Sequence, residues 1–111
     1  MPTTHVPPAE MARSAESAAA YLKTLAHEGR LMILCHLGSG EKSVSELEQL
    51  LEIRQAAVSQ MLARLREEGL VATRREGKVI YYSLADENTA EVINMLYRLF
   101  CSPVEETRDT P

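Results

Sequence analysis

The chain lacks the sequence features of membrane proteins and of the common enzyme classes. Its 111 residues contain no apolar run close to the roughly 20 residues of a membrane span, and no basic patch followed by an apolar core near the start. There is no Gly-rich phosphate loop, no paired-cysteine redox motif and no nucleophile beside a candidate base. We therefore expect a cytoplasmic protein that makes no membrane contact and is not an enzyme.

Clusters of metal ligands are missing as well. The three histidines, His5, His27 and His36, are scattered, and the segment 86–101 contains none. We expect His27 to cap or pack near a helix start, and His36 to face solvent or lie at the edge of the core. The sequence predicts neither a metal site nor a cofactor.

The chain has only two cysteines, Cys35 and Cys101, and both are predicted on buried helices. A cytoplasmic dithiol stays reduced by default, so a bridge between them would be a transient signal and not a structural staple. The alternatives are two inert core thiols, or a small thiol oxidoreductase that nothing beyond the two thiols supports.

The length fits one small domain, which buries a modest fraction of its surface when alone. We expect this domain to span 9–101. Residues 1–8 carry three prolines and residues 102–111 are polar and acidic, so both are predicted to be mobile arms.

Residues 43–84 follow the order helix, turn, helix, β-hairpin. Ser43 and Glu46 have the spacing of a capping box at the first helix. The second helix is predicted over 55–68, with apolar residues at helical intervals, and Gly69 ends it. Two strands follow within 70–84, joined by a turn of residues 75–78. The pattern predicts a winged helix-turn-helix, a mainly α fold with a small β-hairpin.

Three more helices are predicted, over about 9–26, 27–37 and 88–101. Residues 31–35 of the second are apolar all round, which indicates a buried central element. The last helix has more apolar surface than a single core contact requires. We therefore predict a homodimer with a two-fold interface between the first and last helices; the alternative is a deeper monomer core.

The net charge of −4 argues by itself against nucleic acid, because phosphate binding depends on Lys and Arg. The distribution of charge reverses that argument. Residues 54–78 contain six basic and three acidic residues, a local net of +3, whereas the acidic residues concentrate in 41–52 and the tails. One positive face turned to a DNA duplex needs no basic total. The alternative is that these are ordinary solvated charges.

Over roughly residues 15–101 the chain resembles the ArsR family of bacterial winged-helix repressors. The residues that carry the resemblance are Leu22, Leu25, Ala26, His27, Arg30, Leu31, Ile33 and Leu34, then Val58, Ser59, Gln60, Leu62, Leu65, Gly69, Leu70 and Val71, and the segment 77–84 with Tyr81 and Tyr82. The resemblance implies a dimer that reads an inverted repeat of double-stranded DNA, with the recognition helix in the major groove and the wing along the backbone.

By position, the resemblance makes base readers of three residues of the recognition helix and phosphate or groove contacts of four basic residues. The base readers are Gln55, Ser59 and Gln60, and the phosphate contacts are Arg64, Arg74, Arg75 and Lys78. The chain departs from many relatives at Met61, where they have His, and at Glu28 or Gly29, where they have Pro. The departure at Met61 removes a possible contact of the recognition helix, so the operator sequence cannot be carried over.

The metal sites of the family are not matched, because residues 43–47 contain no Cys and 86–101 no His. One Cys in each of two helices instead resembles the sulfide-responsive, persulfide-sensing branch. This implies that the reduced Cys35–Cys101 dithiol binds DNA, and that reactive sulfur species link the thiols through extra sulfur and release it. The alternatives are a sensor of a metal or a general oxidant, or a winged-helix module that serves protein contacts only.

Overall fold

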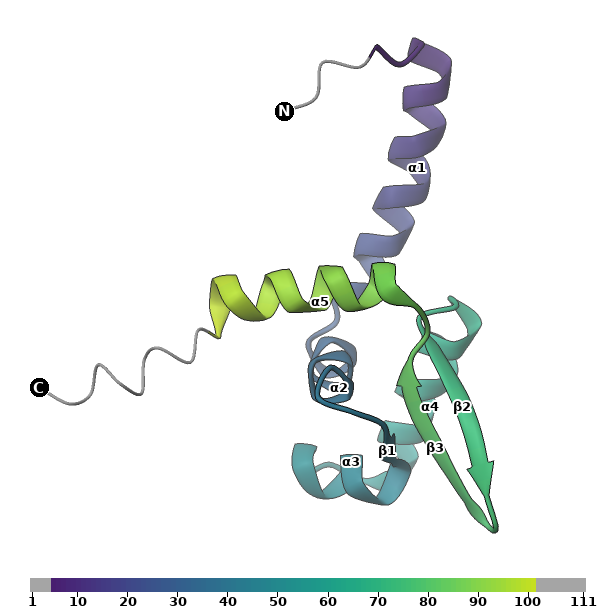
Figure 1. Ribbon diagram of the computed structural model, residues 1–111, viewed down its shortest axis with the longest axis vertical. Coiled ribbons are helices and arrows are strands. Elements are labelled where there is room, and N and C mark those ends of the chain that lie inside the picture. The colour runs from purple at the N-terminus through teal and green to yellow at the C-terminus, as the bar shows by residue number, and fades with distance from the viewer. Residues whose placement is uncertain (1–4, 102–111) are drawn as a thin grey trace, which may run out of the picture.

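The structure of the protein is a computed structural model, and it describes residues 5–101. The elements in chain order are α1 (Pro8–Leu25), α2 (Glu28–Leu37), β1 (Lys42–Ser43), α3 (Val44–Leu51), α4 (Gln55–Glu67), β2 (Val71–Glu76), β3 (Val79–Leu84) and α5 (Glu87–Phe100). In Figure 1, α2, α3 and α4 form the body, the β2–β3 hairpin projects from one end of it, and α5 crosses the opposite end, where α1 stands away from the rest. The fold is mainly helical with a winged helix-turn-helix at its centre, as predicted.

The helix ends lie close to their sequence signals. The Ser43 hydroxyl accepts a hydrogen bond from the Glu46 amide at 3.1 Å, and the Glu46 carboxylate accepts one from the Ser43 amide at 2.8 Å, which completes the predicted capping box. His27 caps α2 through its Nδ1 atom, which accepts from the Arg30 amide at 3.2 Å. Gly69 follows α4 at φ 77°, a backbone conformation that favours glycine. The helix-turn-helix is therefore fixed by local chemistry at both ends.

The sheet has three antiparallel strands in the order β1-β3-β2, one strand more than predicted. The short strand β1 pairs Lys42 with Tyr82 and Ser43 with Tyr81 of β3. The hairpin turn is also tighter than predicted. Pairing of β2 with β3 extends to Glu76 and Val79, so the turn contains only Gly77 and Lys78, with Gly77 at φ 64°.

The core lies between α2, α3, α4 and the base of the hairpin. Leu25 of α1 and Ile93 of α5 complete it, and its buried members are Leu25, Ile33, Leu34, Leu37, Leu47, Val58, Leu62, Leu65, Leu70, Val71 and Ile93. The prediction that residues 31–35 are buried all round is wrong, because Leu31 and Cys35 are only partly buried and Met32 is 42% exposed. One side of α2 therefore reaches the surface of the subunit.

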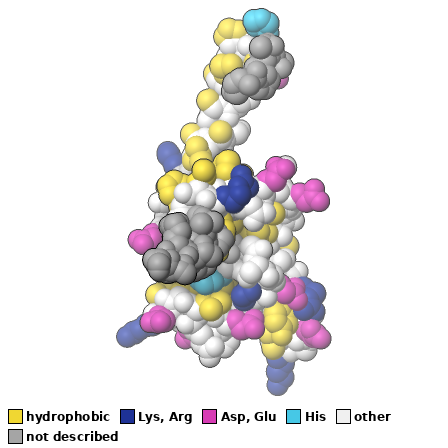
Figure 2. Space-filling model, turned by 60° about the vertical axis from the view of Figure 1, so that its left-hand side comes forward, with side chains coloured by type: hydrophobic (Ala, Val, Ile, Leu, Met, Phe, Trp, Pro, Cys, Tyr) yellow, Lys and Arg dark blue, Asp and Glu magenta, His cyan; other side chains and the backbone are white. Residues whose placement is uncertain are grey.

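Apolar side chains remain exposed on α1 and α5. They include Met11 (56% exposed) and Leu22 (59%) on α1, and Leu99 (65%) and Phe100 (77%) on α5. Figure 2 shows hydrophobic side chains along α1 and across the adjoining end of the body. Among residues 5–101, no helix is long and apolar enough to cross a membrane.

Candidate functional site

The outer face of α4 presents the predicted base readers to solvent. Gln55, Ser59 and Gln60 are exposed, while Val58, Leu62 and Leu65 on the opposite face are buried in the core. Met61, where the sequence predicts a missing contact of the recognition helix, is partly buried and packs against the core. A Cβ atom added to Gly29 of α2 would lie 2.5 Å from the Met61 sulfur, so the two helices meet closely at this point. The departure at Met61 therefore affects the packing of α4 on α2.

The four predicted phosphate contacts differ in their surroundings. Arg75 and Lys78 are exposed at the end of the hairpin and form no ion pair within the described residues. The Arg64 guanidinium contacts the Glu68 carboxylate one helical turn away, at 3.2 Å. Exposed pairs of this kind contribute little to stability and exchange readily, so Arg64 remains available to a phosphate.

Arg74 is held by neighbours from three directions. Its Nε donates to Glu41 Oε2 at 3.2 Å and its Nη2 donates to Glu41 Oε1, while Nη1 donates to Glu76 at 2.9 Å. The guanidinium carbon lies 4.8 Å from the centre of the Tyr81 ring. These hydrogen bonds lower the pKa of Glu41 and raise that of Arg74. Three of the five N–H groups of Arg74 therefore donate to carboxylates, which compete with a phosphate for this side chain.

A groove lies between the recognition helix, which is α4, and the wing, which is the β2–β3 hairpin. It brings together residues that the sequence prediction did not combine. It has a volume of about 360 Å³ and is lined by Ser59, Ala63, Arg66, Glu67 and Tyr82. Ser59, Ala63 and Arg66 fall on one stripe of α4, and Tyr82 faces them from β3. The spacing of four and then three residues marks that stripe in the sequence. The approach of Tyr82 depends on tertiary packing and has no local signal.

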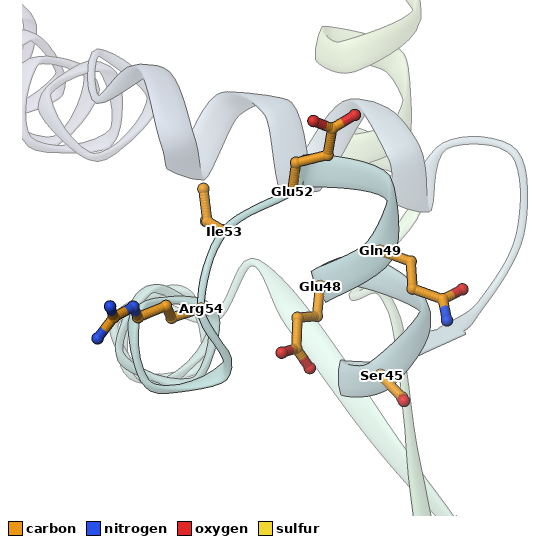
Figure 3. Close-up of a pocket in the computed structure, with 6 residues that line it drawn as sticks. All are labelled: Ser45, Glu48, Gln49, Glu52, Ile53 and Arg54. Carbon is orange, nitrogen blue, oxygen red and sulfur yellow. The ribbon is translucent and has the colours of Figure 1, made fainter.

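A second hollow, of about 470 Å³, lies at the turn between α3 and α4. Figure 3 shows Ser45, Glu48 and Gln49 on α3, Glu52 directly after its end, and Ile53 and Arg54 in the connection to α4. Glu48 and Glu52 make this side of the motif acidic. The positive face expected from the charge distribution is therefore limited to α4 and the hairpin. Basic and acidic side chains are mixed at the lower end of the molecule in Figure 2.

The two cysteines, far apart in the sequence, line the same cleft. This cleft has a volume of about 720 Å³ and is formed by α2, the turn after it and α5. Its lining residues are Glu28, Leu31, Met32, Cys35, His36, Gly38, Ser39, Ile93, Asn94, Tyr97 and Cys101. We call it the thiol cleft. Cys35 is partly buried within α2, whereas Cys101, directly after α5, is exposed, so the expectation of two buried thiols is wrong for Cys101.

The environments of the two thiols differ chemically. Burial raises the pKa of the Cys35 thiol above its ordinary value, and the charge of the nearby Cys101 raises it further. His36, at the partly buried edge of α2, lines the same cleft. Within residues 5–101, no group of three or more His, Cys, Asp or Glu side chains is arranged to hold a metal ion. The chemistry that this cleft offers is that of two neighbouring thiols beside an apolar surface.

Comparison with known proteins decides the family. The family described as "Bacterial regulatory protein, arsR family" matches residues 27–73. The biofilm growth-associated repressor of Agrobacterium fabrum is 51% identical over 100 residues, which cover 90% of this chain and 86% of that protein. The chain belongs to the ArsR family.

Other relatives of the chain, two of them with solved structures, share its fold. The transcriptional activator HlyU of Vibrio cholerae is 45% identical over 83% of this chain and 85% of its own length. The structure of reduced HlyU from this organism matches with a TM-score of 0.80, covering 83% of this chain and 97% of that one, at 44% identity. The transcriptional repressor BigR of Xylella fastidiosa matches with a TM-score of 0.76 at 46% identity, covering 86% and 98%. These relatives are named transcriptional repressors and activators, and none is named an enzyme.

Proposed function

We propose that the protein is a dimeric, DNA-binding repressor that senses reactive sulfur species through Cys35 and Cys101. The observation that carries the proposal is that both thiols line one cleft between α2 and α5. Relatives of similar length are named repressors, and one solved structure is that of a reduced form, which fits a regulator whose state depends on its thiols.

DNA binding in this proposal uses α4 and the hairpin. Gln55, Ser59 and Gln60 reach base edges in the major groove, since their side chains are exposed on the face of α4 away from the core. Arg75 and Lys78 at the hairpin end contact the backbone of the duplex. Arg64 joins them once a phosphate replaces Glu68.

The dimer of the proposal forms through α1 and α5. Both helices expose large apolar side chains, and a small domain gains most by burying such a surface against a second copy. Two copies place two recognition helices on one side of the duplex, where an inverted repeat presents half-sites about 34–36 Å apart or a multiple of that spacing.

The sensing step links the two thiols through sulfur. One thiolate attacks a sulfur–sulfur bond of a polysulfide, and the shorter polysulfide leaves with the electron pair. The first cysteine then carries two added sulfur atoms; the second thiolate attacks the inner one and displaces the outer one as hydrosulfide, so that one extra sulfur bridges Cys35 and Cys101. The polysulfide is the two-electron oxidant, and the released hydrosulfide carries the electrons. An added sulfur relaxes the strict distance limit of a direct disulfide.

The link alters DNA affinity through the helices that it joins. Cys101 follows α5, which belongs to the proposed dimer surface, and Cys35 lies in α2, which packs on α4. A bridge between the two changes how α5 sits on the body, and thereby the spacing of the recognition helices. Because half-sites have a fixed spacing, a small rotation lowers affinity strongly.

The experiment that tests this function measures release of an inverted-repeat operator by polysulfide, using fluorescence anisotropy. The wild-type protein is expected to release the DNA, while Cys35→Ser and Cys101→Ser bind it with nearly wild-type affinity and keep it bound. Release that persists in both variants contradicts the sensor assignment. A gel shift that shows no preference for palindromic over random DNA contradicts the repressor assignment itself.

A further inference from the structure

We propose that Arg74 is a positioning residue that couples the thiol cleft to the β2–β3 hairpin. Arg74 lies on β2 and holds this strand to Glu41, which lies between α2 and β1; we call this contact the brace. The inference depends on the proposed function, because it concerns how the state of the thiols reaches the DNA-binding surface. It assigns Arg74 a role within the protein, where its position in the family led us to expect a phosphate contact.

The brace is a planar, two-point contact. The Nε and Nη2 atoms of Arg74 each donate to a different oxygen of Glu41, and the third arm of the guanidinium donates to Glu76 on the same strand. The face of the guanidinium lies over Tyr81 of β3. Paired hydrogen bonds of this type fix direction as well as distance, so the brace sets the orientation of the hairpin more than its stability.

Glu41 belongs to a segment that is bonded to the end of α2. The Ser39 hydroxyl donates to the His36 carbonyl at 2.9 Å, and Lys42 Nζ donates to the Ser39 hydroxyl at 3.2 Å and to the Gly40 carbonyl at 3.3 Å. Lys42 then pairs with Tyr82 of β3. Residues 36–43 therefore form one hydrogen-bonded unit that contacts the thiol cleft at one end and the hairpin at the other.

The cleft end of this unit also contacts α5. His36 and Ser39 line the thiol cleft with both cysteines. A Cβ atom added to Gly38 would lie 3.7 Å from the Ile93 side chain, so this side chain of α5 lies next to the end of α2 at ordinary van der Waals distance. A sulfur link that moves α5 against α2 acts directly at Gly38, and residues 39–43 carry the displacement to Glu41 and Arg74.

The critical test uses Glu41→Gln, because a carboxylate cannot itself be a phosphate ligand. The measured quantity is the ratio of operator dissociation constants between the polysulfide-linked and the reduced protein, with linkage verified by mass in every sample. We expect the ratio to fall about threefold or more below that of the wild type. Arg74→Lys keeps the positive charge but loses the two-point contact, and is expected to show the same fall with an unchanged salt dependence.

Glu68→Gln is the matched control, because it removes an exposed carboxylate from a similar ion pair, with Arg64, that has no bond to residues 36–43. Its ratio is expected to equal that of the wild type. If Glu41→Gln gives the same ratio of dissociation constants as the control, the proposal is overturned. It is also overturned if Glu41→Gln binds the operator more tightly in the reduced state while its ratio stays at the wild-type value. That result would mean that Arg74 contacts phosphate once the Glu41 carboxylate no longer competes for it.

Hydrogen exchange gives a readout that does not depend on DNA. Linking the thiols in the wild-type protein is expected to change amide exchange in β2 and β3, and Glu41→Gln is expected to remove that change. If linkage leaves DNA affinity unchanged in the wild type, the proposed function fails. If linkage weakens DNA binding equally in the wild type and Glu41→Gln, only the brace is refuted.

Discussion

Cys35 in α2 and Cys101 at the end of α5 line the same cleft, one partly buried and the other exposed. The proximity is what a two-thiol sensor requires, and the difference in exposure predicts unequal reactivity. In the proposed sensing mechanism, the exposed thiol reacts first with a dissolved reagent and the partly buried thiol completes the link.

The first prediction concerns the pH dependence of Cys35. In Cys101→Ser, burial still raises the pKa of the Cys35 thiol, because burial is the larger of the two causes. A raised thiol pKa means less thiolate at neutral pH, so the rate of alkylation by iodoacetamide should increase with pH and continue to rise beyond the ordinary value of 9.0. Cys101 in Cys35→Ser is expected to react faster at neutral pH. Equal rates for the two thiols would refute the difference in environment.

The second prediction concerns the salt dependence of DNA binding. With about six phosphate contacts per dimer, log affinity against log salt should have a slope near −5. Lys78→Gln and Arg75→Gln should each reduce the slope by about 2, since a dimer loses two contacts. Arg13→Gln, on exposed α1, removes the same charge far from α4 and should leave the slope unchanged. A flat dependence in the wild type would contradict a basic binding face.

The third prediction separates base reading from backbone contact. Gln60→Ala should weaken binding to the operator about 10- to 100-fold and binding to random DNA far less, because an amide pairs with base edges. Gln49→Ala removes an exposed amide from α3 and serves as the control. Equal losses of Gln60→Ala on both DNAs would exclude Gln60 as a base reader.

The fourth prediction concerns the dimer. Phe100→Glu places a carboxylate at the most exposed apolar position of α5 and should raise the dimer dissociation constant about a hundredfold, as measured by sedimentation velocity. Leu50→Glu makes the same change at an exposed leucine of α3 and should leave the dimer intact. A Phe100→Glu protein that remains fully dimeric would place the interface elsewhere.

Most of the fold could be predicted because its signals are local. The Ser43–Glu46 capping box and the glycine after α4 mark helix ends within a few residues, and the structure confirms both. Strand β1 was missed because two residues give no periodic pattern, and Lys42 and Ser43 become a strand only through pairing with β3. The turn was predicted too long because Arg75 and Glu76 are polar, although they continue the strand pairing.

The candidate site was less predictable, because its main contacts join distant parts of the chain. Arg74 and Glu41 lie 33 positions apart, and no local spacing indicates that they pair. The exposure of Cys101 was missed for another reason. A terminal helix with apolar residues on most sides has the same pattern whether it enters the core or offers a surface to a second copy, and only coordinates separate the two cases.

The sulfur link between Cys35 and Cys101 can be detected by mass spectrometry of the reduced protein after treatment with inorganic polysulfide, and separately with an oxidised low-molecular-weight thiol. We expect a cross-linked peptide that joins Cys35 and Cys101 with at least one extra sulfur atom after polysulfide, and no peptide with extra sulfur after the oxidised thiol. A direct disulfide in both treatments would indicate a general oxidant sensor. Two unlinked cysteines after polysulfide would contradict a sensor that works by joining these thiols.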